Sequence, residues 1–331
     1  MTKNDKPDFA TPPINEVVCG IRFDKLKKLS TAHWGQYWSK IKSEYPLTED
    51  REPLITGKIE LAVIPPLRRV CFVSEDSNRL IQVQEECFLY NWRKINESDH
   101  YPRFTTIKPL FLEKWEQFKT FAEETIKETI VANRYEITYT NHLYKGEQWI
   151  NFEDLKDIFP CFSWKSKETS KKFLPTPANV NWNLDFHFSE FRSDLKVRLR
   201  SGKDLLNDNE VIVLTLTMGT EVENKALPPL SEWLQNANKV IVNGFVALTS
   251  SEYHGKWGIK NDTSEARITN RINNYKQTIA ELKGERFIPE SIKDVRERYI
   301  NTKGEKFWNN LLKKEKARII AEKMAIEQEY S

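Results

Sequence analysis

The sequence predicts an α+β fold with two halves, each a meander of mostly antiparallel strands covered by a long helix, plus a helical appendage at the C-terminus. Strand-like runs are followed twice by a long amphipathic helix, an order typical of α+β proteins. Several runs alternate apolar and polar residues, as strands of half-buried antiparallel sheets do. From residue 261 the strand patterns stop and charged helical patterns begin. We therefore expect a disordered lead (1–12), two α+β halves (13–150 and 151–260) and a helical extension (261–331).

The first half begins with a strand and a helix. The segment INEVVCGIRF (14–23) is rich in β-branched residues and alternates loosely, which favours a strand. Aromatic and aliphatic residues then recur at helical spacing over 31–44, and Ser30 or Thr31 can serve as the N-cap. Three strands are expected to follow, at 56–64, 68–75 and 79–93.

A second helix and a further strand close the first half. Apolar residues form one stripe over 107–128, which predicts a helix with one buried face. RYEITYTNHL (134–143) alternates with period two and predicts a strand. The segment 144–178 carries a Lys-rich run and two prolines, so we interpret it as a connector with a short helix at 151–159.

The second half repeats the order of strands and one long helix. NVNWNLDFHF (179–188) sets apolar residues against Asn, Asp and His, and strands are also expected at 195–201 and 210–219. Apolar residues cover one face throughout 229–250, the strongest helix prediction in the chain.

The extension carries a short heptad-like seam. Its members are Ile268, Ile272, Tyr275, Ile279 and Leu282. About two heptads are too few for a coiled coil. A second charged helix is expected at 305–329. We expect a helical appendage that packs on the body or on a partner, through which the protein binds a protein partner or self-associates.

Composition narrows the classes of function. The 331 residues carry a formal net charge of only +3, so the chain as a whole is not a polyanion binder. The four cysteines lack metal-ligand or redox spacing, which is typical of a reducing compartment. The polar, Pro-rich N-terminus does not resemble a signal peptide, and no apolar run reaches the ~20 residues of a membrane span. We expect a cytoplasmic protein that does not contact a membrane.

Four segments carry a family resemblance, in chain order. They are PPINEVVCGIRF, LIQVQEECFLYNWRK followed by YPRF, RYEITYTNHL, and LSEWLQNANKVIVNGFVALTSSEYHGKWG. Together they resemble a sporadically distributed, uncharacterised prokaryotic protein family over residues 11–260. The resemblance implies no catalytic residues. The patchy distribution of that family implies accessory gene sets such as phage defence, and the extension beyond 260 looks specific to this chain.

Cofactor and metal motifs are not found in the sequence. No Gly-rich phosphate loop occurs, and the five His residues lack metal-ligand spacing. We therefore expect no cofactor, no metal and no catalytic residues. Cys161 is the one cysteine outside a strand-like run, and we interpret it as inert rather than as a nucleophile.

Arginines in or beside the predicted strands form the candidate binding site. They are Arg22, Arg93, Arg134, Arg198 and Arg200. Closure of one sheet over another would gather these guanidinium groups in a cleft between the halves, where they would bind a nucleotide or another anion. In the alternative, each arginine faces solvent or pairs with a carboxylate such as Glu16 or Glu136, and this reading is favoured because charged residues are mostly exposed.

Two functions follow from these observations. The first is a non-catalytic interaction or scaffold subunit of a prokaryotic multi-protein system, such as antiviral defence, that assembles through its helical extension. The second is a sensor or binding domain for an anionic ligand, a nucleotide or nucleic acid. Within the stretch QVQEECFLYNWRK (82–94), we expect Asn91 to form a turn, Trp92 to anchor the strand end, and Arg93 to be the residue open to a binding role.

Overall fold

The computed structural model describes residues 7–54, 67–162, 177–204, 208–221, 226–259, 272, 276 and 292–314. By its internal contacts the chain divides into two compact units. One unit contains Thr11–Tyr253 and the other contains Pro7–Ala10 with His254–Ser331. Each unit is described by itself.

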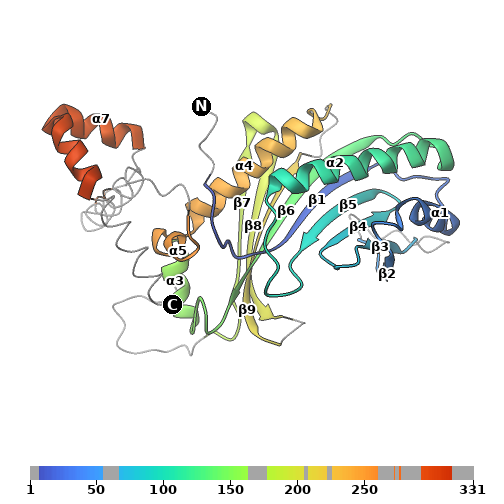
Figure 1. The fold of residues 1–331 in the computed structure, drawn as a ribbon, viewed down its shortest axis with the longest axis horizontal. Helices are drawn as coiled ribbons and strands as arrows, with labels where there is room; N and C mark the ends of the chain where they lie inside the picture. Colours follow the sequence, from blue (N-terminus) through green and yellow to red (C-terminus); the bar gives the residue numbers. More distant parts are fainter. Residues whose placement is uncertain are drawn as a thin grey trace. The chain divides into compact units, whose positions relative to one another are not determined.

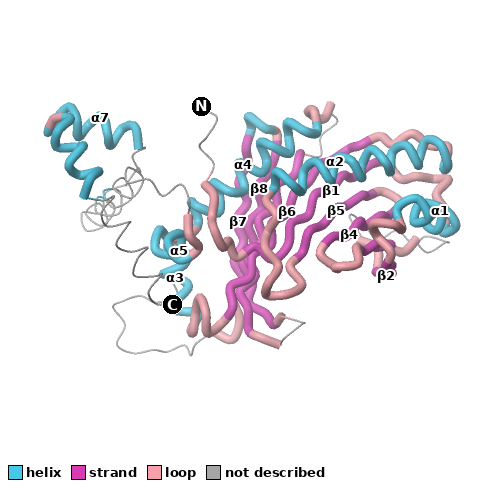
Figure 2. The backbone as a smooth tube through the Cα atoms, viewed as in Figure 1, coloured by secondary structure: helices cyan, strands magenta, loops and turns pink. Residues whose placement is uncertain are grey.

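Nine strands of the described chain form a single antiparallel sheet in the larger unit. Their order across the sheet is β2-β3-β4-β5-β1-β6-β9-β8-β7 (Figures 1 and 2). The α+β class and the antiparallel pairing are therefore confirmed. The strands are β1 (Ile14–Phe23), β2 (Leu47–Arg51), β3 (Arg69–Val73), β4 (Arg79–Gln84), β5 (Cys87–Arg93), β6 (Ala132–Tyr144), β7 (Asn181–Phe188), β8 (Ser193–Lys203) and β9 (Glu210–Thr220).

The two halves of the sheet share one topology. In each, a first strand is followed by a helix, a meander and a long helix, and the first strand pairs with the last strand of its own meander. The helices are α1 (Thr31–Ile41) and α2 (Phe104–Phe121) in the first half, and α3 (Leu155–Ile158) and α4 (Leu230–Leu248) in the second. The first strands β1 and β6 also pair with each other, so they join the halves edge to edge. By this topology β6 is the first strand of the second half and not, as the sequence analysis placed it, the last strand of the first half.

Helices α2 and α4 lie side by side on one face of the sheet (Figure 1). Beneath α2, the ring of Phe88 on β5 stacks on Phe118 at 5.3 Å between centroids and lies 5.5 Å from Trp115. On α4, Asn238 is fully buried and donates to the hydroxyl of Tyr139 on β6 at 2.6 Å. Aromatic burial thus holds α2 to the sheet, and a buried polar contact adds specificity under α4.

Alternation along each strand divides the side chains between two faces. On β1, Val17, Cys19, Ile21 and Phe23 are buried, and Phe23 contacts Trp115 and Phe118 of α2. The intervening residues of β1 point away from the helices. We call this side of the sheet, opposite α2 and α4, the arginine face.

Most predicted elements are confirmed, with shifted ends. β1 has the predicted bounds, and α1 begins at Thr31 with Ser30 as its N-cap. The predicted helix 107–128 is α2, which continues as a π-helical turn at Ala122–Ile126. The strands expected at 68–75, 134–143, 179–188, 195–201 and 210–219, the short helix at 151–159 and the long helix at 229–250 are present as β3, β6, β7, β8, β9, α3 and α4.

Two strand predictions need correction in the first half. The segment 79–93 is not one strand but the hairpin β4–β5, in which Gln84 pairs with Cys87. Its two-residue turn is Glu85–Glu86, without the Gly or Asn that marks such turns in a sequence. The strand β2 has the polar sequence LTEDR and was not predicted. The strand expected at 56–64 lies outside the described residues.

The smaller unit has its own helical core. The helix α7 (Ile292–Lys303) ends at Gly304, whose φ of +84° is left-handed, and residues 305–314 are helical again. Trp308 is buried to 1% exposure with Val295, and further apolar side chains pack around them: Ile272, Tyr299, Ile300, Leu311 and Leu312. The rest of the heptad-like seam lies outside the described residues.

Candidate functional site

All five sequence-predicted arginines lie on the arginine face. Arg22 is the cross-strand partner of Arg134, and Arg93 is the partner of Glu16. Glu16 continues across the sheet through Thr140 and Thr215 to Arg198. Arg200 follows Arg198 two residues along β8, so it shares that face.

Of the five predicted arginines, Arg22 and Arg134 are the two that are direct cross-strand partners. They sit opposite each other on β1 and β6, where two like charges repel. The carboxylate of Glu136 lies between them, 3.9 Å from Nη2 of Arg22 and 3.9 Å from Nε of Arg134. Gly219 on β9 makes room for this arrangement, because a Cβ there would lie 2.6 Å from Nη2 of Arg134. The Glu136 carboxylate thus partly offsets the repulsion between the two guanidinium groups.

Arg198 and Arg200 lie on β8, next to the edge strand β7, whereas Arg22 and Arg134 lie on the central strands β1 and β6. Nη1 of Arg198 donates to the Asp185 carboxylate at 2.7 Å and to the Leu184 carbonyl at 3.2 Å. This ion pair, with the Asp185 side chain 61% exposed, is a surface pair of small net stabilisation. Arg200 is exposed, and we find no hydrogen bond or ion pair from its side chain to another described residue.

The five arginines do not converge. Arg22 is in register with Cys87, six residues before Arg93 on β5, a separation of ~20 Å along the strand. Arg93 and Arg198 lie in one cross-strand row with three strands between them, or ~19 Å across the sheet. The expected closure of one sheet over another does not occur, because β1 and β6 join the halves edge to edge.

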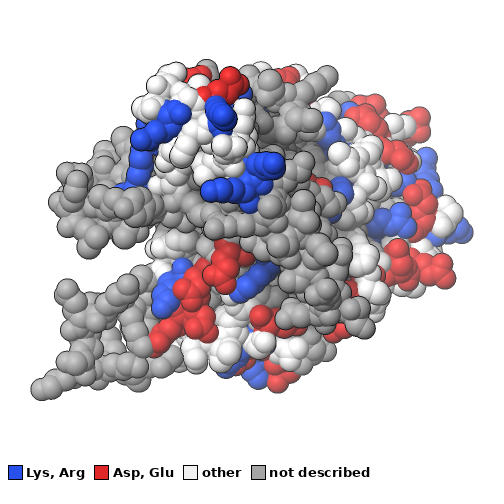
Figure 3. Space-filling model, turned by 60° about the vertical axis from the view of Figure 1, so that its left-hand side comes forward, with Lys and Arg blue, Asp and Glu red and all other residues white. Residues whose placement is uncertain are grey.

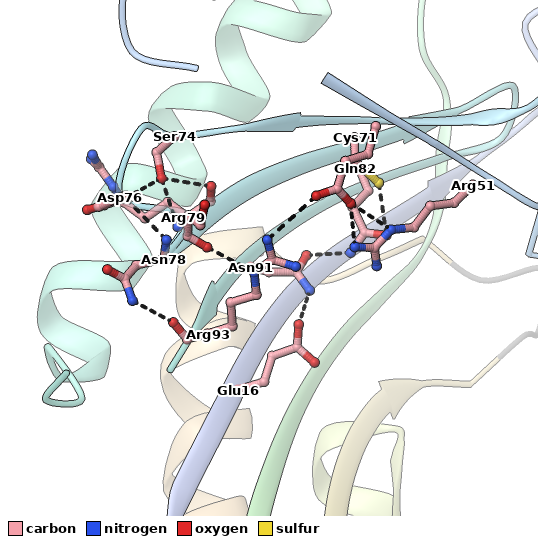
Figure 4. A network of polar contacts seen from close by, with 12 residues as sticks. Glu16, Arg51, Cys71, Ser74, Asp76, Asn78, Arg79, Gln82, Asn91 and Arg93 are labelled. Atoms are coloured by element: carbon pink, nitrogen blue, oxygen red, sulfur yellow. Dashed lines mark hydrogen bonds and ion pairs between the residues drawn. The ribbon is translucent and has the colours of Figure 1, made fainter. Parts of the chain in front are cut away.

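A buried polar network occupies the arginine face of the first half (Figure 4). Asn91 is 2% exposed; its Nδ2 donates to Glu16 Oε1 at 2.7 Å, and its Oδ1 accepts from Gln82 Nε2 at 2.8 Å. Gln82 Oε1 in turn accepts from Nη1 of Arg69 at 3.0 Å. We call Glu16, Asn91, Gln82 and Arg69 the amide network. It ties four neighbouring strands, β1, β5, β4 and β3, together on one face.

Two further arginines flank the amide network. Arg51 donates from Nη2 to Glu49 at 2.6 Å, and Nη2 of Arg93 lies 3.9 Å from the same carboxylate. Nε of Arg93 donates to the carbonyl of Ser77 at 2.9 Å, which ties the end of β5 to the turn before β4. Burial raises the pKa of the nearby Cys71 thiol, and Arg51, Arg69 and Arg93 act in the opposite direction.

The amide network is almost self-satisfied. Within the described residues, one donor of this network, Nε of Arg69, is buried and has no hydrogen-bond partner. Buried amides with complete partners specify strand register and make one arrangement strongly preferred. The contacts of Asn91 and Arg93 therefore hold neighbouring strands and turns of the sheet together. The positive charge beside the amide network is carried by Arg51 and Arg93.

The QVQEECFLYNWRK stretch behaves differently from expectation at Asn91. Asn91 is not a turn former, because it lies inside β5 with its side chain buried in the amide network. Trp92 is buried on the helix-covered face, and its ring lies 5.6 Å from that of Tyr101. The anchor role expected of Trp92 fits this packing.

A His–Tyr–Asp cluster on the arginine face was missed by the sequence analysis. The hydroxyl of Tyr144 donates to Asp204 at 2.6 Å, and Nδ1 of His142 lies 3.3 Å from that hydroxyl. Burial lowers the pKa of His142, an effect that Asp204 opposes. In the sequence, only the i, i+2 spacing of His142 and Tyr144 indicates that these two side chains share a face of β6. Asp204 follows β8, 60 residues after Tyr144, and nothing local links it to them. Its pairing with β6 depends on the β6-β9-β8 order.

Metal and nucleophile chemistry finds few candidates in the described part of the chain. Across those residues, no three His, Cys, Asp or Glu side chains gather where they could hold a metal ion. Burial raises the pKa of the Cys87 thiol to about 12 and also raises that of Cys161, so neither is an activated thiolate at neutral pH.

Charges of both signs are interspersed on the surface drawn in Figure 3. Blue and red side chains alternate there with uncharged ones, so the described residues of this view form no broad field of one sign. Among the helices that the structure describes, none combines the length and the apolar character needed to cross a bilayer.

The fold and the site define an α+β protein built on one nine-stranded antiparallel sheet, with a polar, arginine-bearing face. No protein-family model, no curated protein and no solved structure matches the chain. The resemblance to a sporadically distributed prokaryotic family therefore stays a prediction.

Proposed function

We propose that this protein is a non-catalytic interaction subunit of a prokaryotic multi-protein system that works in the cytoplasm. Its helical C-terminal unit is the assembly element, and its sheet unit is the rigid body that is assembled. The family resemblance favours antiviral defence as the setting.

The observation that supports this proposal is the separate helical core of the smaller unit. Trp308 is buried among side chains of that unit, so the helices carry their own packing. Next to this core, Phe307 is 45% exposed and stacks on Tyr299 with 6.2 Å between ring centroids. Exposed aromatic side chains on a rigid helical surface are typical anchors of protein interfaces.

The test is co-purification of the full chain with the products of its neighbouring genes. Phe307→Glu places a charge at the exposed aromatic, and we expect it to abolish co-purification while helix content by circular dichroism is unchanged. Val131→Glu is the matched control, because Val131 is 58% exposed and lies in the sheet unit. Equal retention of partners by both variants would refute the proposal.

A second candidate function is the binding of a nucleotide or nucleic acid on the arginine face. The observation that favours it is the Arg22–Arg134 pair, two cations opposite each other with the Glu136 carboxylate 3.9 Å from each, in which Nε of Arg134 is buried without a hydrogen-bond partner among the described residues. An anionic group would relieve this repulsion through charge-assisted hydrogen bonds.

Thermal-shift and salt-dependent gel-shift assays test this second function. Nucleotides and oligonucleotides should raise the melting temperature, and binding should weaken with added salt. Arg22→Ala and Arg134→Ala, which remove members of this pair, should reduce the shift, whereas Lys203→Ala, on β8 and paired with Asp208, should not. A shift that is unchanged in both arginine variants would count against the arginine face.

A further inference from the structure

The strand β7 is an edge strand with an unusual composition. It has eight residues, NWNLDFHF, and pairs with β8 on one side; among the described residues, no strand pairs with its other side. Natural edge strands are blunted by short length, charge, Lys or Pro. The opposite edge strand β2 follows this rule, with five residues of sequence LTEDR. β7 contains no Lys, Arg or Pro.

One face of β7 is apolar and incompletely covered. Trp182, Leu184, Phe186 and Phe188 alternate on the side opposite the polar residues, and Phe186 is 41% exposed. The ring of Phe162 packs edge-on against Trp182 at 6.5 Å, so one end of this stripe has an aromatic neighbour. The exposed centre of the stripe lies beside the edge of β7 that no described strand pairs with, where an added strand would extend both the ladder and the apolar surface.

The edge of β7 that faces away from β8 is formed by the backbone groups of its odd-numbered residues. The backbone N–H of Ser201 donates to the carbonyl of Val180 at 2.9 Å, so Val180 and Ser201 are a hydrogen-bonded pair in the β7–β8 register. Because the direction of backbone groups alternates, even-numbered residues face β8 and the groups of Asn181, Asn183, Asp185 and His187 point outward. Any strand added here pairs with those four residues.

We propose that β7 pairs antiparallel with β7 of a second copy of this chain, with Leu184 on the two-fold axis. The polar and apolar faces of the two strands continue into each other only if odd-numbered residues lie opposite odd-numbered ones and even-numbered residues opposite even-numbered ones. The Leu184 register sets Trp182 opposite Phe186 of the second copy and Asn183 opposite its Asp185. Asn181 then lies opposite His187.

This register is self-complementary in charge and shape. The Asn183 amide faces a carboxylate to which it can donate, and the aromatic pair covers the exposed Phe186. A register centred one residue later would set Asp185 opposite Asp185, a like-charge pair that is destabilising. The Leu184 register also uses residues 181–187, nearly the whole strand.

The contact is a small one, which sets its expected strength. A seven-residue edge pairing falls at the low end of specific interfaces, so we expect a reversible dimer with a dissociation constant on the order of micromolar. It uses the sheet unit and is independent of the helical extension. Failure of this pairing therefore leaves the proposed assembly role of the smaller unit intact.

Sedimentation velocity of the full chain over a concentration series tests the dimer. Wild type should shift from monomer to dimer, and Phe186→Lys should raise the dissociation constant about tenfold or more, since it loses apolar burial and adds like charges at the edge. Leu47→Lys is the matched control: Leu47 is 49% exposed on the other edge strand, and its variant should dimerise as wild type does. A wild type that stays monomeric, or equal effects of both variants, would overturn the proposal.

A proline variant guards against misfolding of the lysine variant. The N–H of Asn183 points outward, so Asn183→Pro removes a donor for the added strand and leaves the β7–β8 hydrogen bonds in place. Its circular dichroism should match wild type, and its dimer should be lost. A folded Asn183→Pro protein that still dimerises would contradict the pairing.

Cross-linking tests the register. In a Cys161→Ser background, which removes the exposed native cysteine, Leu184→Cys should give a disulfide-linked dimer on oxidation, because opposite residues lie within disulfide range. Phe186→Cys is the control, since its two copies would lie four residues apart along the strands, ~14 Å. Cross-linking through Phe186→Cys instead, or through neither, would overturn the register.

Discussion

The substitution Asn91→Leu tests whether the amide network holds the sheet. Leu has nearly the shape of Asn but makes no hydrogen bonds, so Gln82 Nε2 loses its acceptor at 2.8 Å and Glu16 loses a donor at 2.7 Å. Gln82 is 5% exposed and cannot replace the lost partner with water readily. An unsatisfied buried amide costs about 1–3 kcal/mol, and the bond to the half-buried carboxylate contributes a similar amount. We expect the free energy of unfolding to fall by about 3 kcal/mol.

Urea denaturation followed by circular dichroism measures this change. The dependence of the free energy on urea should be unchanged, because the surface exposed on unfolding is the same. Thr140→Val is the control: Thr140 lies beside Glu16 on the same face, and its exchange should alter stability by less than ~0.5 kcal/mol. Gln82→Met combined with Asn91→Leu should cost less than the sum of the single changes by about 1 kcal/mol.

Two results would refute this reasoning. A stability within ~0.5 kcal/mol of wild type would mean that the network does not stabilise the sheet. A clear gain in stability would mean that Asn91 is kept at a cost to the fold, as residues of ligand sites are.

Three further predictions concern other buried groups. Burial lowers the pKa of His254 to about 4, below the ~6.5 of an unfolded chain. As pH falls, the unfolded state therefore binds a proton before the folded state does. The free energy of unfolding should fall by an amount on the order of 3 kcal/mol between pH ~6.5 and pH ~4. Urea titrations at several pH values should show a shallower loss in His254→Phe, and equal slopes would contradict the assignment. The side chain of Lys114 is 1% exposed and donates to Glu44 at 2.6 Å. Glu44→Gln should destabilise the fold by about 1–2 kcal/mol and Lys114→Met by less, because Glu44→Gln leaves the buried Lys114 charge with a weaker partner. A larger loss of thermal stability in Lys114→Met than in Glu44→Gln would contradict this reasoning. Gly219→Ala would place a Cβ 2.6 Å from Nη2 of Arg134 and should lower the melting temperature slightly. In an Arg134→Ala background, Gly219→Ala should no longer lower the melting temperature. If it still lowers the melting temperature strongly in that background, the contact with Arg134 is not the cause.

Local patterns predicted the elements whose signal is complete within a few residues. The alternation of 134–143 and the apolar stripe of 229–250 correspond to β6 and α4, because each element must bury one face whatever it packs against. The hairpin turn at Glu85–Glu86 carries no such signal. Its carbonyls accept from the backbone N–H groups of Leu26 and Phe23, contacts from a distant segment that stabilise the turn.

Strand β2 and the amide network show the same limit. LTEDR has no strand pattern of its own, and it is extended because it pairs with β3. Asn91 resembles a turn former by residue type, yet it lies mid-strand because Gln82 and Glu16 satisfy its amide from neighbouring strands. Both outcomes depend on partners that are distant in the sequence.

The sequence by itself determined the type of most elements and which side chains share a face, since side-chain direction follows the local backbone period. It thereby determined that Arg198 and Arg200 point to one side of their strand. The tertiary structure decided the order and register of nine strands, and so the separation of ~20 Å between Arg22 and Arg93. The physical reason is that strand pairing is non-local: the β1–β6 contact joins residues more than 100 positions apart, and no periodicity within either strand specifies its partner.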